Sequence, residues 1–446
     1  MLTRIGFLVS SQWHSSSMKY PLFTLSLYIS LVFFCTMALI GVDYGGADES
    51  PVYMILCAAA GGISILSTIK YFIRHRGLGT HNILLFIIPI LIYIGGAFDG
   101  AFLDTSVSLI EKKQLFFFAF SYPGICVGCH LAHENSLHKI AKWLDILILI
   151  IAGGLVLTVP KMLTDAFWSL GGTSYQVMAY AGGTAFGLNL CFFLFGDEME
   201  LFSIFSTKKY RIVRIILLCA LGLCTLLSGG RGGALLMILN GFLMILLVGK
   251  VRQTVFYVIL TIVLIIAVSS SLDQLGLSSR FDTSIERTFQ YLDADKGIDM
   301  ENGSSNRDVV YEKALDIIID KPFFGHGMYG AYEQFDGTSP HNIFLEVMIQ
   351  GGMLYMALFL FLLSRLYKKL KRFISISKGN YLIIPIVTYP CVMLLFSGSY
   401  MTDVLFWFSV SFLFVYSYQI DPDETECNQE HIRQQEKASH TIPELA

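Results

Sequence analysis

A series of apolar runs, each long enough to cross a membrane, constrains the fold of this 446-residue chain more than any other feature. A helix needs about 20 apolar residues to span roughly 30 Å of hydrocarbon. Only 15% of the residues are charged, against about 25% in an ordinary soluble domain. We therefore expect an all-α integral membrane protein with about 12 transmembrane helices. The runs cover residues 21–41, 52–73, 82–103, 114–131, 143–159, 175–196, 212–229, 233–249, 254–270, 343–364, 381–397 and 402–420.

The distribution of basic residues predicts the orientation of these helices. Cytoplasmic loops carry an excess of lysine and arginine. With the N-terminus inside, 21 of the 31 basic residues fall on the cytoplasmic side, and the short outer loops hold only Lys112, Lys113, Lys161 and Arg231. We expect both termini to be cytoplasmic, and the first apolar run is long enough to remain as an anchor.

Most of the polar material outside the membrane lies in one loop, Ser271–Asn342, between the ninth and tenth predicted helices. A single large outer loop is more typical of an enzyme or receptor than of the two rocking halves of a transporter. A transporter nevertheless remains an alternative. The predicted organisation is helices 1 to 9 in residues 1–270, the outer loop in 271–342, helices 10 to 12 in 343–420, and a polar tail, expected to be disordered, in 421–446.

The outer loop is expected to contain amphipathic helices. After Ser304, apolar residues recur at helical spacing on one face, and Pro322 ends the pattern. Arg307 falls in the first turn of this helix, above the outer mouth of the bundle. A weaker amphipathic stretch upstream carries Arg280 and Arg287. The apolar face of the first helix consists of Val310, Ala314, Ile317 and Ile318.

The charge of this loop limits what it can bind. It has 13 acidic and 6 basic residues, a net charge of −7, and the whole chain has a net charge of −3. A nucleic-acid partner is therefore not expected, because a basic surface is missing. A phosphate site would have to use a few specific arginines, whose forked donors fit phosphate oxygens. The alternative to a phosphate site is that the arginines of this loop pair with acidic neighbours; these arginines are Arg280, Arg287 and Arg307.

Three short patterns resemble cofactor or metal motifs in the wrong context. The glycines of residues 325–330 follow a predicted helix rather than the strand that a dinucleotide site requires. The acidic residues in 293–301 lack a correctly placed glycine for a calcium loop. Residues 126–130 match a c-type haem motif, but they lie in an apolar run and face the cytoplasm in the predicted topology. We expect neither a cofactor nor a metal ion.

Two features on the outer side suggest chemistry. Ser339 is suited to cap the tenth helix and Pro340 to open it, which places His341 in the first turn. The positive end of a helix disfavours imidazolium, and a neutral imidazole can serve as a general base. The alternative is an ordinary interfacial histidine. The second feature is the turn Ser228–Gly233, whose open backbone amides and Arg231 suit an anion; the alternative is a simple helical hairpin.

In their order and spacing these motifs resemble the bacterial O-antigen polymerases and O-antigen ligases. The resemblance covers residues 220–360 specifically. Tyr311 stands where the family often has tryptophan, and glycine rather than serine directly precedes Arg231. The matching residues are the Arg231 turn, Arg307, Ala314, Pro322, Gly325, Gly327, His341–Leu345, Gly351 and Gly352.

The resemblance implies a membrane glycosyltransferase at the periplasmic face of the bacterial inner membrane. Its substrate would be an oligosaccharide linked to undecaprenyl diphosphate, and its partners would be membrane lipids and a chain-length regulator. Arg231 and Arg307 would hold the donor diphosphate, with Arg280 as a third contact. His341 would be the catalytic residue that assists the acceptor hydroxyl.

The resemblance leaves the acceptor open. A polymerase transfers the chain to another lipid-linked repeat unit, and a ligase transfers it to lipid A-core. We favour the polymerase, because polymerase sequences are the more varied and the motifs here are imperfect. A transporter or flippase of envelope glycolipids, and a non-catalytic assembly factor, are the alternatives outside this family's chemistry.

Overall fold

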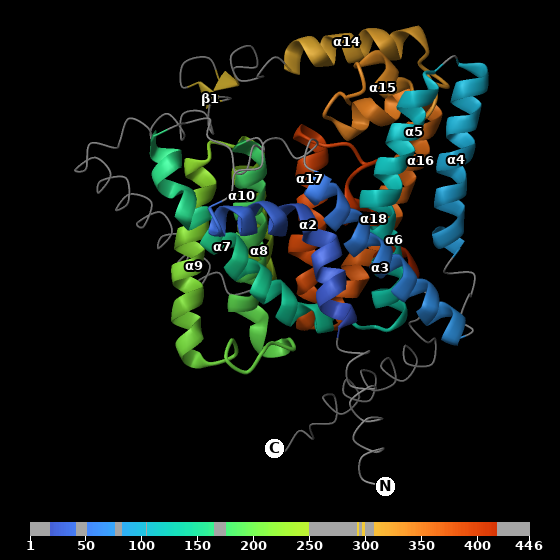
Figure 1. Ribbon diagram of the computed structural model, residues 1–446. Helices are drawn as coiled ribbons and strands as arrows, with labels where there is room; N and C mark the ends of the chain where they lie inside the picture. Colours follow the sequence, from blue (N-terminus) through green and yellow to red (C-terminus); the bar gives the residue numbers. More distant parts are fainter. Residues whose placement is uncertain are drawn as a thin grey trace, which may run out of the picture.

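The computed structural model describes residues 18–41, 51–75, 83–103, 105–164, 175–248, 292–293, 297–298 and 307–416. This part of the chain is almost entirely helical (Figure 1). The α-helices are α2 (Lys19–Leu39), α3 (Pro51–His75), α4 (Leu84–Phe102), α5 (Val107–Phe116), α6 (Tyr122–His133), α7 (Ala141–Thr164), α8 (Tyr175–Phe195), α9 (Lys208–Leu227), α10 (Arg231–Val248), α14 (Arg307–Asp320), α15 (Gly330–Gln334), α16 (Ile343–Ile376), α17 (Ile383–Phe396) and α18 (Val404–Tyr416).

Shorter elements complete this arrangement. A π-helical segment, η3 (Phe117–Ser121), joins α5 to α6. The 3-10 helices are η4 (Leu137–Ile140), η6 (Gly196–Glu198) and η7 (Lys378–Leu382). Two-residue strands β1 (Leu292–Asp293) and β2 (Gly297–Ile298) pair antiparallel, with Leu292 opposite Ile298.

The fold is an all-α membrane protein, as the sequence predicts. Within the described residues, nine helices are long and apolar enough to cross a bilayer, and two shorter apolar helices, Arg231–Leu247 and Val404–Tyr416, accompany them. Every predicted span has a helical counterpart except 254–270, which lies outside the described residues. The prediction of 12 spans therefore stays a prediction. The charged side chains that precede the fourth predicted span lie inside its helix, so that segment is longer than predicted, Val107–His133.

The helices pack in close pairs. α18 lies along α6, α8 lies between α9 and α10, and α2 packs on α3 and α7. The α6–α18 contact depends on Gly124 and Gly128, four residues apart. A Cβ on Gly124 would stand 2.2 Å from the carbonyl oxygen of Val404, and one on Gly128 would stand 2.1 Å from Oγ of Ser411. Small residues at this spacing let transmembrane backbones approach closely.

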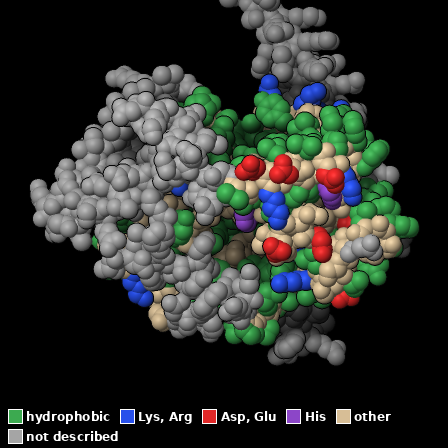
Figure 2. Space-filling model, turned by 90° about the horizontal axis from the view of Figure 1, so that it is seen from above, with side chains coloured by type: hydrophobic (Ala, Val, Ile, Leu, Met, Phe, Trp, Pro, Cys, Tyr) green, Lys and Arg blue, Asp and Glu red, His purple; other side chains and the backbone are tan. Residues whose placement is uncertain are grey.

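α14 and α15 lie across one end of the bundle (Figure 1). The predicted amphipathic face of α14 is confirmed: Ala314 and Ile318 are buried against Phe335 and Ile349, and Val310 and Ile317 pack beside them. The helix ends at Asp320, ahead of Pro322, as predicted. On the surface of the molecule seen from above, acidic and basic side chains are interspersed among polar and hydrophobic atoms (Figure 2).

The glycine-containing segment after α14 is anchored to two transmembrane helices. The buried carboxylate of Asp99 in α4 accepts a 2.6 Å hydrogen bond from the backbone amide of Tyr329. The Tyr329 hydroxyl donates to the carbonyl of Ile92 at 3.1 Å. Gly325 and Gly327 have φ of 67° and 89°, so this segment turns sharply between α16 and α4. The glycines therefore shape the connection that follows α14.

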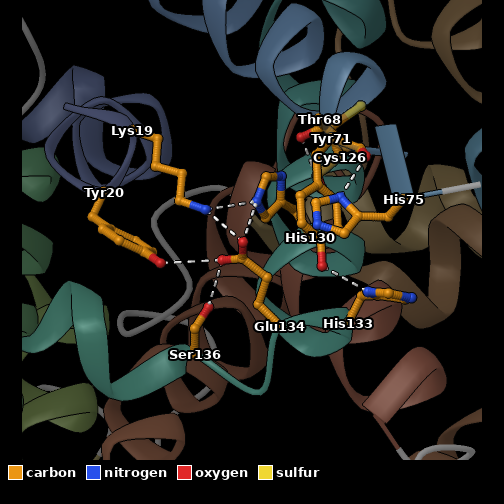
Figure 3. A network of polar contacts seen from close by, with 10 residues as sticks. All are labelled: Lys19, Tyr20, Thr68, Tyr71, His75, Cys126, His130, His133, Glu134 and Ser136. Atoms are coloured by element: carbon orange, nitrogen blue, oxygen red, sulfur yellow. Dashed lines mark hydrogen bonds and ion pairs between the residues drawn. The ribbon is translucent and has the colours of Figure 1, made fainter. Parts of the chain in front are cut away.

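A polar network joins α2 to α6 (Figure 3), at the end of the bundle opposite α14 (Figure 1). Lys19 Nζ donates to Glu134 Oε1 at 2.5 Å, and the Tyr20 hydroxyl donates to Glu134 Oε2 at 3.1 Å. The ring of Tyr71 stacks on buried His130, 4.2 Å between centroids. Burial alone would raise the pKa of Glu134, but contacts with His130 and Lys19 hold it well below its usual range. This ion pair therefore joins the start of α2 to the end of α6.

Candidate functional site

Three of the four predicted site residues lie within the described part of the chain, at the end of the bundle that carries α14. Arg231 is the first residue of α10, Arg307 is the first residue of α14, and His341 lies just before α16. Arg280 lies outside the described residues. The structure places Arg307 close enough to His341 for the positive charge of the guanidinium to lower the pKa of the imidazole.

His341 is not in the first turn of the helix, so the predicted capping arrangement is wrong. Asn342 is the N-cap: its Oδ1 accepts hydrogen bonds from the amides of Phe344 at 3.0 Å and Leu345 at 3.3 Å. His341 has φ of 54°, in the left-handed region that a helix cannot include. The side-chain amide of Asn342 replaces Ser339 as the cap because it lies next to the first free amides.

The left-handed backbone of His341 is a strained conformation of the kind that is concentrated at functional sites. Its side chain remains exposed. Partial desolvation by its neighbours, together with the charge of Arg307, lowers the pKa of His341, and a hydrogen bond to the backbone of Ser397 opposes this only in part. The imidazole is therefore neutral at neutral pH. A neutral imidazole is also what the sequence predicts, but its cause here is desolvation and the charge of Arg307 rather than the positive end of a helix.

Arg307 and His341 meet at the C-terminal end of α17. The guanidinium carbon of Arg307 lies 5.8 Å from the centroid of the Phe396 ring, a cation–π contact. The neighbouring residue, Ser397, contacts His341 through its backbone. The alternative pairing of Arg307 with Asp308 is not decided, because the side chain of Asp308 lies outside the described part of the chain.

Hydrogen bonds connect Ser397, at the end of α17, to two residues of α8. The Oγ of Ser397 donates to Oε1 of Gln176 at 3.2 Å and lies 3.1 Å from the hydroxyl of Tyr180. A serine hydroxyl has one proton, so Tyr180 is the donor in the second contact. The charge of Arg307 also acts on Tyr180. Sequence reasoning missed Gln176, Tyr180 and Ser397, whose only signal is that they are polar residues near the ends of predicted spans.

The glycine-rich turn that carries Arg231 packs against the same part of α8. Gly229 has φ of 66° and lets the chain reverse between α9 and α10. A Cβ on Gly232 would lie 2.0 Å from the Tyr180 hydroxyl oxygen, and one on Gly233 would lie 2.2 Å from the backbone of Ala179. Gly232, the residue after Arg231, therefore packs against Tyr180, which is also the hydrogen-bond partner of Ser397.

Arg307 and His341 thus lie beside the polar contact between Tyr180 and Ser397, and the turn that carries Arg231 packs against the same tyrosine. Arginine side chains can neutralise a diphosphate and bind its oxygens through paired donors. A neutral imidazole can accept a proton from a hydroxyl group. Among the described residues there is no group of three His, Cys, Asp or Glu side chains that could hold a metal ion. Cys126 and Cys129 are buried with free thiols in α6.

Comparison with known proteins identifies the segment that contains this site. Residues 215–362, about a third of the chain, match a family model described as O-antigen ligase. The matched segment includes Arg231, Arg307 and His341. No curated protein and no solved structure matches the chain. Residues 215–362 of this multi-pass membrane protein are therefore similar to the O-antigen ligase family.

Proposed function

We propose that the protein is a polymerase of O-antigen or a related surface polysaccharide in the bacterial inner membrane. It transfers a glycan chain from undecaprenyl diphosphate to a lipid-linked repeat unit at the periplasmic face, with both chain termini in the cytoplasm. The observation that carries the proposal is that Arg307 and a neutral His341 contact neighbouring residues, Phe396 and Ser397, while the Tyr180 hydroxyl meets both Ser397 and the turn of Arg231.

The arginines bind the donor. Arg307 and Arg231 each open a helix, where backbone amides without intrahelical partners add to the positive field. Their side chains hold the two phosphate groups, with Arg280 as a third contact. Charge builds up on the diphosphate as the glycosidic bond breaks, so the same arginines stabilise the transition state more than the bound donor.

His341 acts on the acceptor. Its neutral imidazole takes the proton of the acceptor hydroxyl while the hydroxyl oxygen attacks the anomeric carbon of the donor. The new bond joins that carbon to the acceptor oxygen, and the bond from the carbon to the phosphate oxygen breaks. Undecaprenyl diphosphate leaves with the electron pair, and the imidazolium then returns its proton to solvent. Arg307 beside the ring favours this loss of the proton.

A ligase that transfers the glycan to lipid A-core is the second candidate, and it is favoured by the match to a family described as O-antigen ligase. The donor, the bond broken and the roles of the three residues are the same. The gel pattern of surface polysaccharide in a deletion strain separates the two. A single repeat unit on core indicates a lost polymerase, and polymer retained on the lipid carrier indicates a lost ligase.

Complementation of that strain tests the site. We expect His341→Ala and Arg307→Ala, confirmed as folded and membrane-inserted, to fail to restore long chains. His138→Ala and Arg365→Ala are matched controls, because both side chains lie outside the site, His138 in η4 and Arg365 in α16. Full complementation by His341→Ala would refute the assigned role.

A transport function or a non-catalytic assembly role is tested with purified protein. Detergent micelles have no membrane barrier, so turnover of a lipid-linked oligosaccharide in micelles cannot be transport. We expect glycan transfer under these conditions and its loss in Arg307→Ala. An assembly factor would instead tolerate replacement of Arg307 in the cell.

A further inference from the structure

A buried carboxyl group lies in the first turn of the helix that follows the proposed base. Glu346, in the first turn of α16, is 0% exposed and is five residues after His341. Its Oε1 lies 2.7 Å from the hydroxyl of Tyr332 in α15 and 2.6 Å from Oγ of Ser399. These two hydroxyl oxygens also lie 2.5 Å from each other. Three oxygens from three segments of the chain therefore form a closed triangle.

The number of protons in this triangle depends on the state of Glu346. Tyrosine and serine each supply one hydroxyl proton, and an ionised carboxylate supplies none. If Glu346 is ionised, only two protons are available for the three short oxygen–oxygen contacts. One of these contacts then has no hydrogen bond, and the lone pairs of its two oxygens repel each other. With a protonated Glu346, each oxygen donates once and accepts once around the ring. The geometry therefore fits the neutral acid.

The surroundings of the other carboxyl oxygen also favour a neutral Glu346. Oε2 of Glu346 is buried and has no side-chain hydrogen-bond partner among the described residues, and the backbone amide of Tyr400 is the further donor that acts on this carboxyl group. An unpartnered oxygen of a buried carboxylate costs far more than one of a neutral acid. Lys113, whose Nζ lies 4.3 Å from the centroid of the Tyr332 ring, is the cation that faces this group from α5.

The triangle fixes the turn that touches His341. Ser399 belongs to the same short connection between α17 and α18 as Ser397, whose backbone contacts the His341 ring. One helical turn beyond Glu346, Gln350 accepts a hydrogen bond from the Tyr400 hydroxyl of this connection. Two residues of α16 thus hold the connection in place beside the base.

We infer that Glu346 is a neutral carboxylic acid and a positioning residue that holds the Ser397–Tyr400 connection against His341. Its neutrality matters as much as its contacts. A neutral acid holds the turn through its hydrogen bonds and adds no negative charge to the buried cluster. The titratable and charged groups that face Glu346 are Lys113 and three tyrosines, Tyr332, Tyr355 and Tyr400, and Arg307 faces His341.

Glutamine and alanine substitutions separate these roles. Glu346→Gln keeps one amide donor and one carbonyl acceptor without any charge, so we expect it to retain most of the kcat with an unshifted acid limb in the pH profile. Glu346→Ala frees the connection, and misplacement of the base by about 1 Å costs up to about 100-fold in kcat. The donor KM should change little. Glu333→Gln, an exposed glutamate of α15, is the matched control.

The protonation state has a readout that does not require activity. Infrared difference spectra of wild type against Glu346→Gln should show a carbonyl band of a protonated carboxylic acid, which Glu333→Gln leaves in place. The role in catalysis rests on the proposed function, but this band does not. Loss of activity in Glu346→Gln together with absence of the band would overturn the inference. Full activity in Glu346→Ala would overturn the positioning role.

Discussion

The hydroxyl of Tyr180 donates to Oγ of Ser397 across 3.1 Å and joins the middle of the chain to its last quarter. At the start of α10, the same hydroxyl packs against Gly232, where a Cβ would lie 2.0 Å from the hydroxyl oxygen. On the α17 side, Ser397 contacts His341 through its backbone. This single contact therefore couples the turn of Arg231 to the proposed base.

Replacing Tyr180 by phenylalanine tests this coupling. The ring remains in place and only the hydrogen bond is lost, which contributes about 1 kcal/mol or about fivefold in rate. We expect a lower kcat for glycan transfer and a nearly unchanged melting temperature in detergent. Tyr93→Phe, at an exposed ring of α4, is the control. An unaltered kcat in Tyr180→Phe would show that the hydroxyl contact does not position the site.

The pH dependence of kcat tests the state of His341. Desolvation and the charge of Arg307 lower its pKa below the ordinary value of about 6.5. The base is the neutral form, so activity should be full at neutral pH and fall only as pH drops through this lowered pKa. Arg307→Gln removes the positive charge and should move this acid limb toward higher pH, although the donor KM also rises. A limb that stays in place or moves to lower pH would contradict the electrostatic role.

Much of this fold follows from sequence because hydrocarbon imposes a simple length rule on each helix. The amphipathic pattern of α14 and its stop before Pro322 follow in the same way. The site follows only in part. Arg307 and His341 carry chemical signals of their own, but Ser397 becomes significant only when α17 meets α8. The left-handed His341 also could not be predicted, since competition between Ser339 and Asn342 for the cap is decided by geometry.

Gly233 is expected to be essential for a steric reason. Alanine there would place its Cβ 2.2 Å from the backbone of Ala179, which cannot move without shifting α8. A Cβ on Gly241, in the same helix, would meet no described atom within 4 Å. Gly233→Ala should therefore lower the melting temperature and activity together. Gly241→Ala should be neutral or stabilising by up to about 1 kcal/mol, because alanine favours the helix. Equal effects of the two substitutions would refute the close contact between α8 and α10.

A buried ion pair outside the proposed site is expected to affect the stability of the fold and not the transfer reaction. Arg214 of α9 donates to both carboxylate oxygens of Asp145 in α7, at 3.0 and 2.7 Å, and also reaches Oδ1 of Asn189 at 3.3 Å. Both charged side chains are nearly fully buried. Removal of one partner leaves the other charge without compensation in a medium of low dielectric constant.

Asp145→Ala should therefore destabilise the protein by about 3–5 kcal/mol, the usual cost of an uncompensated buried charge. The double variant Asp145→Leu with Arg214→Met removes both charges, and we expect it to recover most of that loss. Arg211→Ala, at an exposed position of the same helix, serves as the control. Thermal unfolding in detergent measures all three, and transfer activity of the folded fraction should stay close to wild type. If the double variant were no more stable than Asp145→Ala, the cost would come from lost packing rather than from the unpaired arginine.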